Sequence, residues 1–168
     1  MTPDAIVIVL LAAATTTAAA IDLRTRRVPN ELTVSLAIVG VGLAVLGLGR
    51  VSVAAAFAGC GVGLLVMLPL HAIGAMGAGD VKLFAAAGTL LGPAVAFQAF
   101  LYTAIAGGVI ALAIALHRGA LRHTLVHTVG LAGANGAARA AVHDGAANNR
   151  FAYASAIAVG TLLAAWVA

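Results

Sequence analysis

Two aspartates stand at the ends of apolar segments in this chain, Asp22 after the first segment and Asp80 between two later ones. Only five of the 168 residues are acidic, and an ionisable side chain beside a membrane segment is costly enough to indicate a function. Two carboxyl groups that approach closely cannot both ionise, so one keeps its proton. The ionised group can activate a water molecule for attack on a carbonyl carbon, while the protonated group stabilises the oxyanion. The two aspartates are therefore candidates for a hydrolytic pair.

The second aspartate lies in the sequence GAGDVKL, residues 77–83. Glycine lets a backbone bend sharply and approach another group closely, so we expect Gly77 and Gly79 to shape an active-site loop. Lys82 and Arg26 are candidates for electrostatic support of the carboxylates. The alternative for Lys82, which we favour, is that its ammonium group extends to lipid headgroups.

The composition is that of an integral membrane protein. Hydrophobic residues make up 63% of the chain and charged residues 8%, with a mean hydropathy of +1.12, whereas a soluble domain carries about 25% charged residues. The length allows about five or six spans of roughly 20 residues each and no separate soluble domain. The net charge of +4 fits the basic loops of a membrane protein and indicates no nucleic-acid surface.

The apolar segments predict an all-α fold, a polytopic membrane helix bundle of about six transmembrane segments: 5–21, 32–48, 53–73, 81–92, 94–116 and 151–167. The fourth helix is short because Gly92-Pro93 interrupts it after roughly 18 Å, and a short buried helix would let water reach Asp80. Asn30 is expected to cap the second helix. Gly59, Gly61 and Gly63 suit close helix–helix contact, although glycine is also simply common in membrane helices.

Residues 1–168 are predicted to form a single membrane-embedded domain. Within it, residues 117–150 are expected to be a cytoplasmic loop, whose alternating basic and apolar residues suit an amphipathic helix at the membrane surface. His123 and His127 are spaced as metal ligands on a helix can be. No Glu or Cys lies nearby to complete a site, so we expect no metal.

The basic residues predict the orientation in the membrane. Eight of the nine Lys and Arg residues fall on one side of the six-segment arrangement, and basic loops face the cytoplasm. This places the N-terminus outside and both Asp22 and Asp80 at the cytoplasmic side of the inner (cytoplasmic) membrane. The alternative for the first segment is a cleaved signal peptide, but the basic residues follow this segment, whereas in a signal peptide they precede it.

No other protease chemistry is indicated by the sequence. The serines in or beside the apolar runs lack a paired His/Asp pattern. Cys60 is the single cysteine and has no nearby base, so it provides neither an activated thiol nor a disulfide.

Residues 22–30, DLRTRRVPN, resemble the first-aspartate signature of the type IV prepilin peptidases, D-x-x-x-R-x-[IV]-P-N. The sequence GAGD at 77–80 is similar to the GxGD motif of the same family. Two motifs in this order, separated by two spans, are a specific combination. Residues 153–160 resemble the closing segment of the family, without the proline that commonly precedes its tyrosine. The resemblance covers nearly the whole chain apart from 117–150.

The resemblance implies an intramembrane-type aspartic endopeptidase, without a cofactor, that cleaves the leader of pilin-like precursors at the cytoplasmic face. Asp22 and Asp80 would be the catalytic pair. Larger members carry a cytoplasmic insertion between the first two spans and also methylate the new N-terminus. This chain is similar to the small, peptidase-only branch associated with tight-adherence (Flp-type) pili. Its partners would be pilin-like precursors and membrane lipid, while its oligomeric state stays open.

Other interpretations of the two aspartates also stay open. Asp80 can cap a helix that starts at Val81, and Asp22 can be an interfacial residue neutralised by Arg24 and Arg26. A small proton- or ion-coupled transporter would use the pair as a relay, although broken helices in inverted repeats would be typical of that class. A non-catalytic subunit of a pilus or secretion machine would share the composition and the partners.

Overall fold

The computed structural model describes residues 3–25, 27–117 and 153–168. Every regular element in these ranges is a helix: α1 (Pro3–Thr25), α2 (Asn30–Val45), α3 (Val53–Ala72), α4 (Ala78–His117) and α7 (Tyr153–Val167). The helices α1, α3 and α4 are long and apolar enough to cross a membrane, and α2 and α7 are shorter apolar helices. The predicted all-α membrane protein is therefore confirmed. The predicted loop at 117–150 lies outside the described residues except for its first residue, and so do His123 and His127.

The described helices number five, where the sequence predicted about six separate segments. The predicted fourth and fifth segments form one element, α4, which is interrupted at Gly92. The backbone of Gly92 has φ 75° and ψ 171°, a conformation that favours glycine, and Pro93 has no N–H to continue the helix. The chain turns back at this point, so α4 has a first half, residues 78–91, and a second half, residues 93–117.

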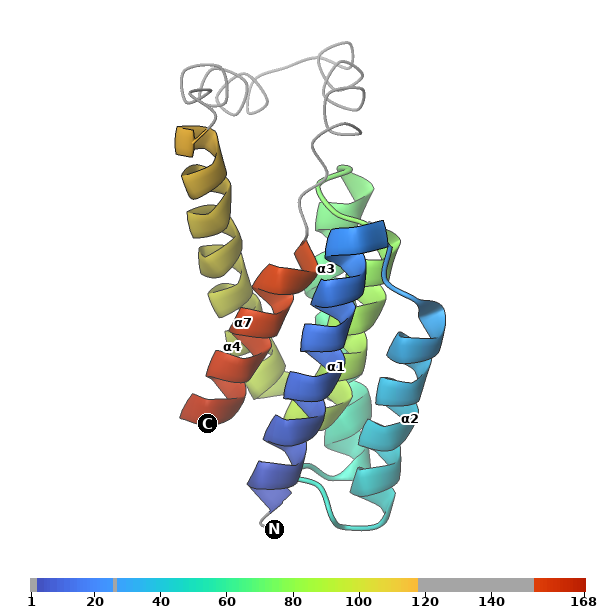
Figure 1. The fold of residues 1–168 in the computed structure, drawn as a ribbon. Coiled ribbons are helices and arrows are strands. Elements are labelled where there is room, and N and C mark those ends of the chain that lie inside the picture. The colour runs from blue at the N-terminus through green and yellow to red at the C-terminus, as the bar shows by residue number, and fades with distance from the viewer. Residues whose placement is uncertain (1–2, 26, 118–152) are drawn as a thin grey trace.

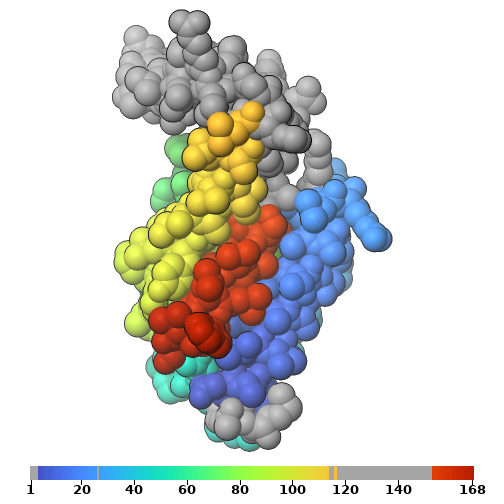
Figure 2. Space-filling view, turned by 60° about the vertical axis from the view of Figure 1, so that its left-hand side comes forward, coloured from blue at the N-terminus to red at the C-terminus, as the bar shows by residue number. Residues whose placement is uncertain are grey.

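The first half of α4 is the centre of the bundle (Figure 1). Every residue from Leu83 to Gly92 is buried, and α4 packs against α1, α2, α3 and α7. At 1.5 Å per residue this half is about 21 Å long, so the short fourth helix expected from the sequence is present within α4. Figure 2 shows α7 lying between α1 and the second half of α4 on one face of the molecule.

Glycines allow α3 to approach the first half of α4 closely. A Cβ atom on Gly59 would lie 2.1 Å from the Gly88 carbonyl oxygen, and one on Gly63 would lie 2.9 Å from the Ala85 Cα. No larger residue fits at these two positions unless the helices move apart. The expected helix–helix contact is therefore present at Gly59 and Gly63 but not at Gly61, where a Cβ atom would meet nothing within 4 Å.

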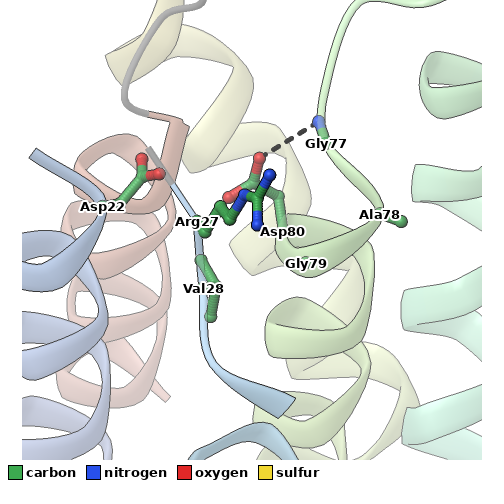
Figure 3. Close-up of a pocket in the computed structure, with 7 residues that line it drawn as sticks. All are labelled: Asp22, Arg27, Val28, Gly77, Ala78, Gly79 and Asp80. Carbon is green, nitrogen blue, oxygen red and sulfur yellow. Dashed lines mark hydrogen bonds between the residues drawn. The ribbon is translucent and has the colours of Figure 1, made fainter. Parts of the chain in front are cut away.

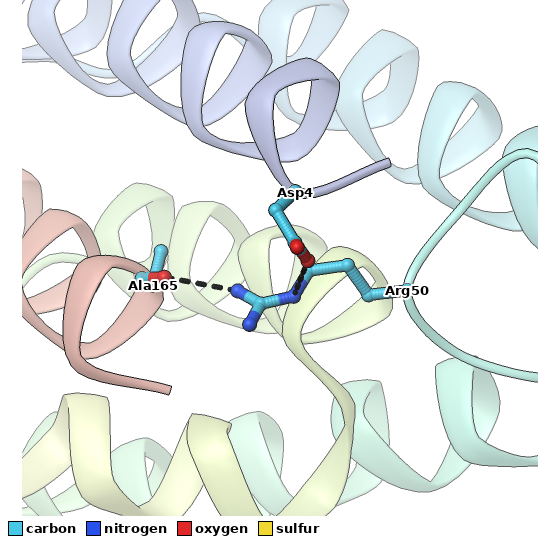
Figure 4. A network of polar contacts seen from close by, with 3 residues as sticks. All are labelled: Asp4, Arg50 and Ala165. Carbon is cyan, nitrogen blue, oxygen red and sulfur yellow. Dashed lines mark hydrogen bonds and ion pairs between the residues drawn. The ribbon is translucent and has the colours of Figure 1, made fainter. Parts of the chain in front are cut away.

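An arginine joins three parts of the bundle at the end opposite the two aspartates. Arg50 lies in the connection between α2 and α3. Its Nε atom is 2.8 Å from Asp4 Oδ1 in α1, and its Nη1 atom donates a 2.9 Å hydrogen bond to the Ala165 carbonyl in α7 (Figure 4). The cation at this end is thus neutralised by a local acid and held against the end of α7.

Two helix starts differ from the prediction. Asn30 is the first residue of α2 rather than its cap, and Pro29 occupies the capping position without a side-chain hydrogen bond. The helix that carries Asp80 starts at Ala78, earlier than the predicted start near Val81. An acid is favourable in the first turn of a helix, which explains why the helix can include Asp80 instead of following it.

Replacing Gly59 with alanine is expected to destabilise the bundle, because the new Cβ atom would overlap the Gly88 carbonyl. Overpacking of this kind costs about 1–3 kcal/mol, and the free energy of unfolding of the purified protein in detergent should fall by that amount. Gly61→Ala is the matched control, since open space surrounds that position, and its change should stay within about 0.5 kcal/mol. Equal stability of the two variants would contradict the close α3–α4 contact.

Candidate active site

A pocket of about 170 Å³ lies where α1 ends and α4 begins. The residues that line it are Asp22, Arg27, Val28, Gly77, Ala78, Gly79 and Asp80. Figure 3 shows Asp22 reaching it from α1 and Asp80 from the first turn of α4, with Arg27 and Val28 on the α1–α2 connection. The structure thus brings the two candidate aspartates and the two candidate glycines to one cavity.

Both carboxyl groups of the pocket belong to buried residues. Asp22, in the last turn of α1, is 8% exposed, and Asp80 is 7% exposed. Such burial in an apolar bundle is costly, so the presence of two acids at one cavity indicates a function and not only a structural role.

The pocket can hold water. A single water molecule needs only about 10–15 Å³ of cavity volume, so the pocket has ample room for one. Within the described ranges, no three His, Cys, Asp or Glu side chains gather as metal ligands.

The backbone at Gly77 holds the Asp80 side chain. The Gly77 N–H donates a 3.2 Å hydrogen bond to Asp80 Oδ2 (Figure 3), and the Asp80 N–H donates to the Gly77 carbonyl at 3.2 Å. Asp80 is the third residue of α4, so its carboxylate makes the acidic half of a capping box. Asp80 therefore does cap its helix, as one interpretation expected, but it does so from the third position of the helix and not from the residue before the helix.

Space, rather than an unusual backbone conformation, explains the two glycines. A Cβ atom on Gly79 would lie 3.0 Å from Val28 Cβ, because the α1–α2 connection passes directly against the first turn of α4. A Cβ atom on Gly77 would lie 3.3 Å from Asp80 Oδ2. Neither glycine has a positive φ. The sharp bend expected from the sequence is therefore less important than the close approach.

Lys82 contacts a neutral partner in the structure. Its Nζ atom donates a 3.0 Å hydrogen bond to Asn30 Oδ1, in an exposed position that links the starts of α4 and α2. Lys82 thus helps to fix the two helix starts beside the pocket. Arg26, the other residue considered for electrostatic support, lies outside the described residues.

Four residues at or near the pocket were not among the candidates from the sequence. Arg27, Val28 and Ala78 line the cavity. Arg27 and Val28 belong to the motif at 22–30, so this motif is the sequence feature that could have identified them. Tyr153, the first residue of α7, is close enough to interact electrostatically with Asp80. The motif at 153–160 indicated that this segment matters, but sequence alone does not place α7 beside the pocket.

Comparison with known proteins gives one family. A family model described as the type IV leader peptidase family matches residues 8–112. The match runs from α1 into the second half of α4 and contains both Asp22 and Asp80. No curated protein and no solved structure matches the chain.

The shared pocket predicts that cysteines at positions 22 and 80 can be crosslinked. In a Cys60→Ser background, which removes the single native cysteine, the Asp22→Cys/Asp80→Cys variant should form an internal link with a short bifunctional thiol reagent. Mass spectrometry of the digested protein detects the linked peptides. The control pair is Asp4→Cys/Asp80→Cys, because position 4 lies about 27 Å from position 22 along α1. Equal yields for the two pairs would show that the pocket is not formed as described.

Proposed function

Because this chain belongs to the type IV leader peptidase family, we propose that it is a membrane aspartic endopeptidase that removes the leader peptide of pilin-like precursors. Family membership supports a leader peptidase-like protease. The finer assignment is carried by one observation, that two buried acids from α1 and α4, Asp22 and Asp80, line the same pocket. Among the described residues that line it there is no hydroxyl, thiol or imidazole side chain, so we assign the acid–base catalysis to its two carboxyl groups.

In the proposed reaction the two carboxyl groups share one proton. The ionised carboxylate takes a proton from a water molecule in the pocket, and the water oxygen attacks the carbonyl carbon of the scissile peptide bond. The protonated carboxyl group donates a hydrogen bond to the carbonyl oxygen as it becomes an oxyanion. The tetrahedral intermediate then breaks its C–N bond, and the leaving amine receives a proton from the pair.

The surrounding backbone supports this chemistry by holding the two acids in place. The Gly77 N–H fixes Asp80 Oδ2, and the contact between Gly79 and Val28 fixes the α1–α2 connection against the first turn of α4. Fixed geometry of this kind lowers the entropic cost of reaching the transition state. The rigid first turn of α4 is therefore part of the proposed machinery.

We also propose that the pocket faces the cytoplasm, that the N-terminus lies outside, and that the chain crosses the inner membrane six times, with each half of α4 counted once. The basis is the charge at the two ends of the bundle. Arg24, Arg27 and Lys82 lie at or near the pocket end, whereas Arg50 lies at the other end beside Asp4, and basic residues favour the cytoplasmic side.

The proposed substrate is a precursor with a basic leader followed by an apolar helix. Its helix would lie in lipid along the bundle, with the scissile peptide bond at the height of the pocket. The short connection between α1 and α2, residues 26–29, supports a peptidase without methyltransferase activity, as in the branch associated with tight-adherence (Flp-type) pili. No cofactor and no nucleic acid enter the proposed reaction.

Asp22→Asn and Asp80→Asn are each expected to abolish cleavage of a co-expressed pilin-like precursor. Loss of a general acid or base lowers a rate by about 10²–10⁴-fold, and here each member of the pair is needed for the other to act. The measurement is the shift of the precursor to the mature size on a gel, with mass spectrometry of the new N-terminus.

Asp4→Asn provides the matched control, since it makes the same substitution at the opposite end of α1 and breaks only the ion pair with Arg50, in which the Asp4 side chain is exposed. This variant should cleave within about twofold of the original protein, because exposed ion pairs contribute little. All three variants should insert into the membrane in equal amounts. Normal cleavage by either pocket variant would rule out the aspartate pair, whereas a precursor left uncleaved by the original protein would favour a transporter or a non-catalytic assembly subunit.

A further inference from the structure

A histidine outside the pocket contacts the peptide group that leads into it. His71 lies in the last turn of α3, and its Nδ1 atom is 3.0 Å from the Met76 carbonyl oxygen. A carbonyl oxygen can only accept a hydrogen bond, so the imidazole donates through Nδ1–H. This contact spans the whole turn between α3 and α4.

The same peptide group holds Asp80 on its other side. The Met76 carbonyl and the Gly77 N–H belong to one planar unit, and that N–H donates to Asp80 Oδ2 at 3.2 Å. A donor at the carbonyl oxygen polarises the peptide group and strengthens its N–H as a donor. His71 is therefore connected to the Asp80 carboxylate through a single rigid group.

The turn itself is anchored to the end of α3 only as far as Ala75. The Ile73 N–H donates to the Pro69 carbonyl at 3.1 Å, and the Ala75 N–H donates to the Leu70 carbonyl at 2.9 Å. Residues 71–75 are exposed, whereas Met76 is buried. The imidazole of His71 adds one more contact with the turn, at the Met76–Gly77 peptide group, which is the group that contacts Asp80.

We infer that His71 is a positioning residue of the proposed peptidase: its Nδ1–H orients the Met76–Gly77 peptide group, and this group holds the Asp80 carboxylate in its working orientation. The inference rests on the proposed function, because the oriented carboxylate is one of the proposed pair. The imidazole acts at a distance from the reacting atoms. The competing role is a purely structural one, in which His71 only stabilises the C-terminal end of α3.

Two substitutions separate these roles. His71→Asn can place an amide N–H where Nδ1–H stood, whereas His71→Leu has similar bulk and no donor. With a purified pilin-like precursor in detergent, His71→Leu should lower kcat about tenfold with KM within about twofold, the size expected for the loss of one hydrogen bond. His71→Asn should restore kcat to within about threefold of the original protein. Gln98→Leu removes a side-chain hydrogen bond to Tyr102 elsewhere in α4 and should leave both constants unchanged.

A second measurement is independent of catalysis. In protein labelled with ¹⁵N-glycine, the Gly77 amide, assigned with Gly77→Ala, should exchange its hydrogen about tenfold faster in His71→Leu and at nearly the original rate in His71→Asn. Equal kcat and equal exchange in the two His71 variants would overturn the inference, and so would a loss confined to KM or to the amount of folded protein. If the original protein cleaves no precursor, the proposed function fails, while the exchange rates still decide whether His71 holds the peptide group.

Discussion

A carboxyl group inside an apolar bundle must be held by polar partners, because burial without them is costly. The pocket end of this protein is built around that requirement for two acids. Asp80 meets it by lying in the first turn of α4, where the Gly77 N–H binds its carboxylate and the helix dipole is favourable. Asp22 lies in the last turn of α1 and shares the same cavity. Placing the acids at helix ends, rather than in the middle of helices, keeps both within reach of water and brings Asp80 to a backbone donor.

The close packing of α3 against α4 determines what surrounds this pocket. Gly59 and Gly88 allow the two backbones to touch, and the short turn between Ala72 and Ala78 joins α3 to α4 just before Asp80. The end of α3 then brings His71 to the Met76 carbonyl. Small residues in the apolar middle of the bundle thus hold together the two helices whose ends carry His71 and Asp80.

Much of the pocket could be predicted from the sequence, because it depends on local pattern and on the alternation of helices. The scarcity of acids pointed to Asp22 and Asp80, and counting spans brought both to one end. The features that the sequence did not predict are contacts between different elements, and such contacts produce no periodic pattern in the sequence. The interruption at Gly92-Pro93 lies where the sequence predicted it, but the hydrogen bond from Lys82 Nζ to Asn30 Oδ1 was not predicted. The contact of His71 could not be predicted from the sequence, because its partner is a backbone carbonyl and every residue has one.

The central claim is that Asp22 and Asp80 act together on a water molecule that attacks a peptide carbonyl. The most direct test is the binding of a peptide that mimics the tetrahedral intermediate, with a hydroxyl-bearing carbon in place of the scissile carbonyl, once the cleavage site of a precursor has been mapped. The protein should bind this peptide at least about 100-fold more tightly than the same sequence with an uncleavable amide, and the Asn variants of both acids should lose the difference. Equal affinity for the two peptides in the original protein would contradict the aspartate mechanism.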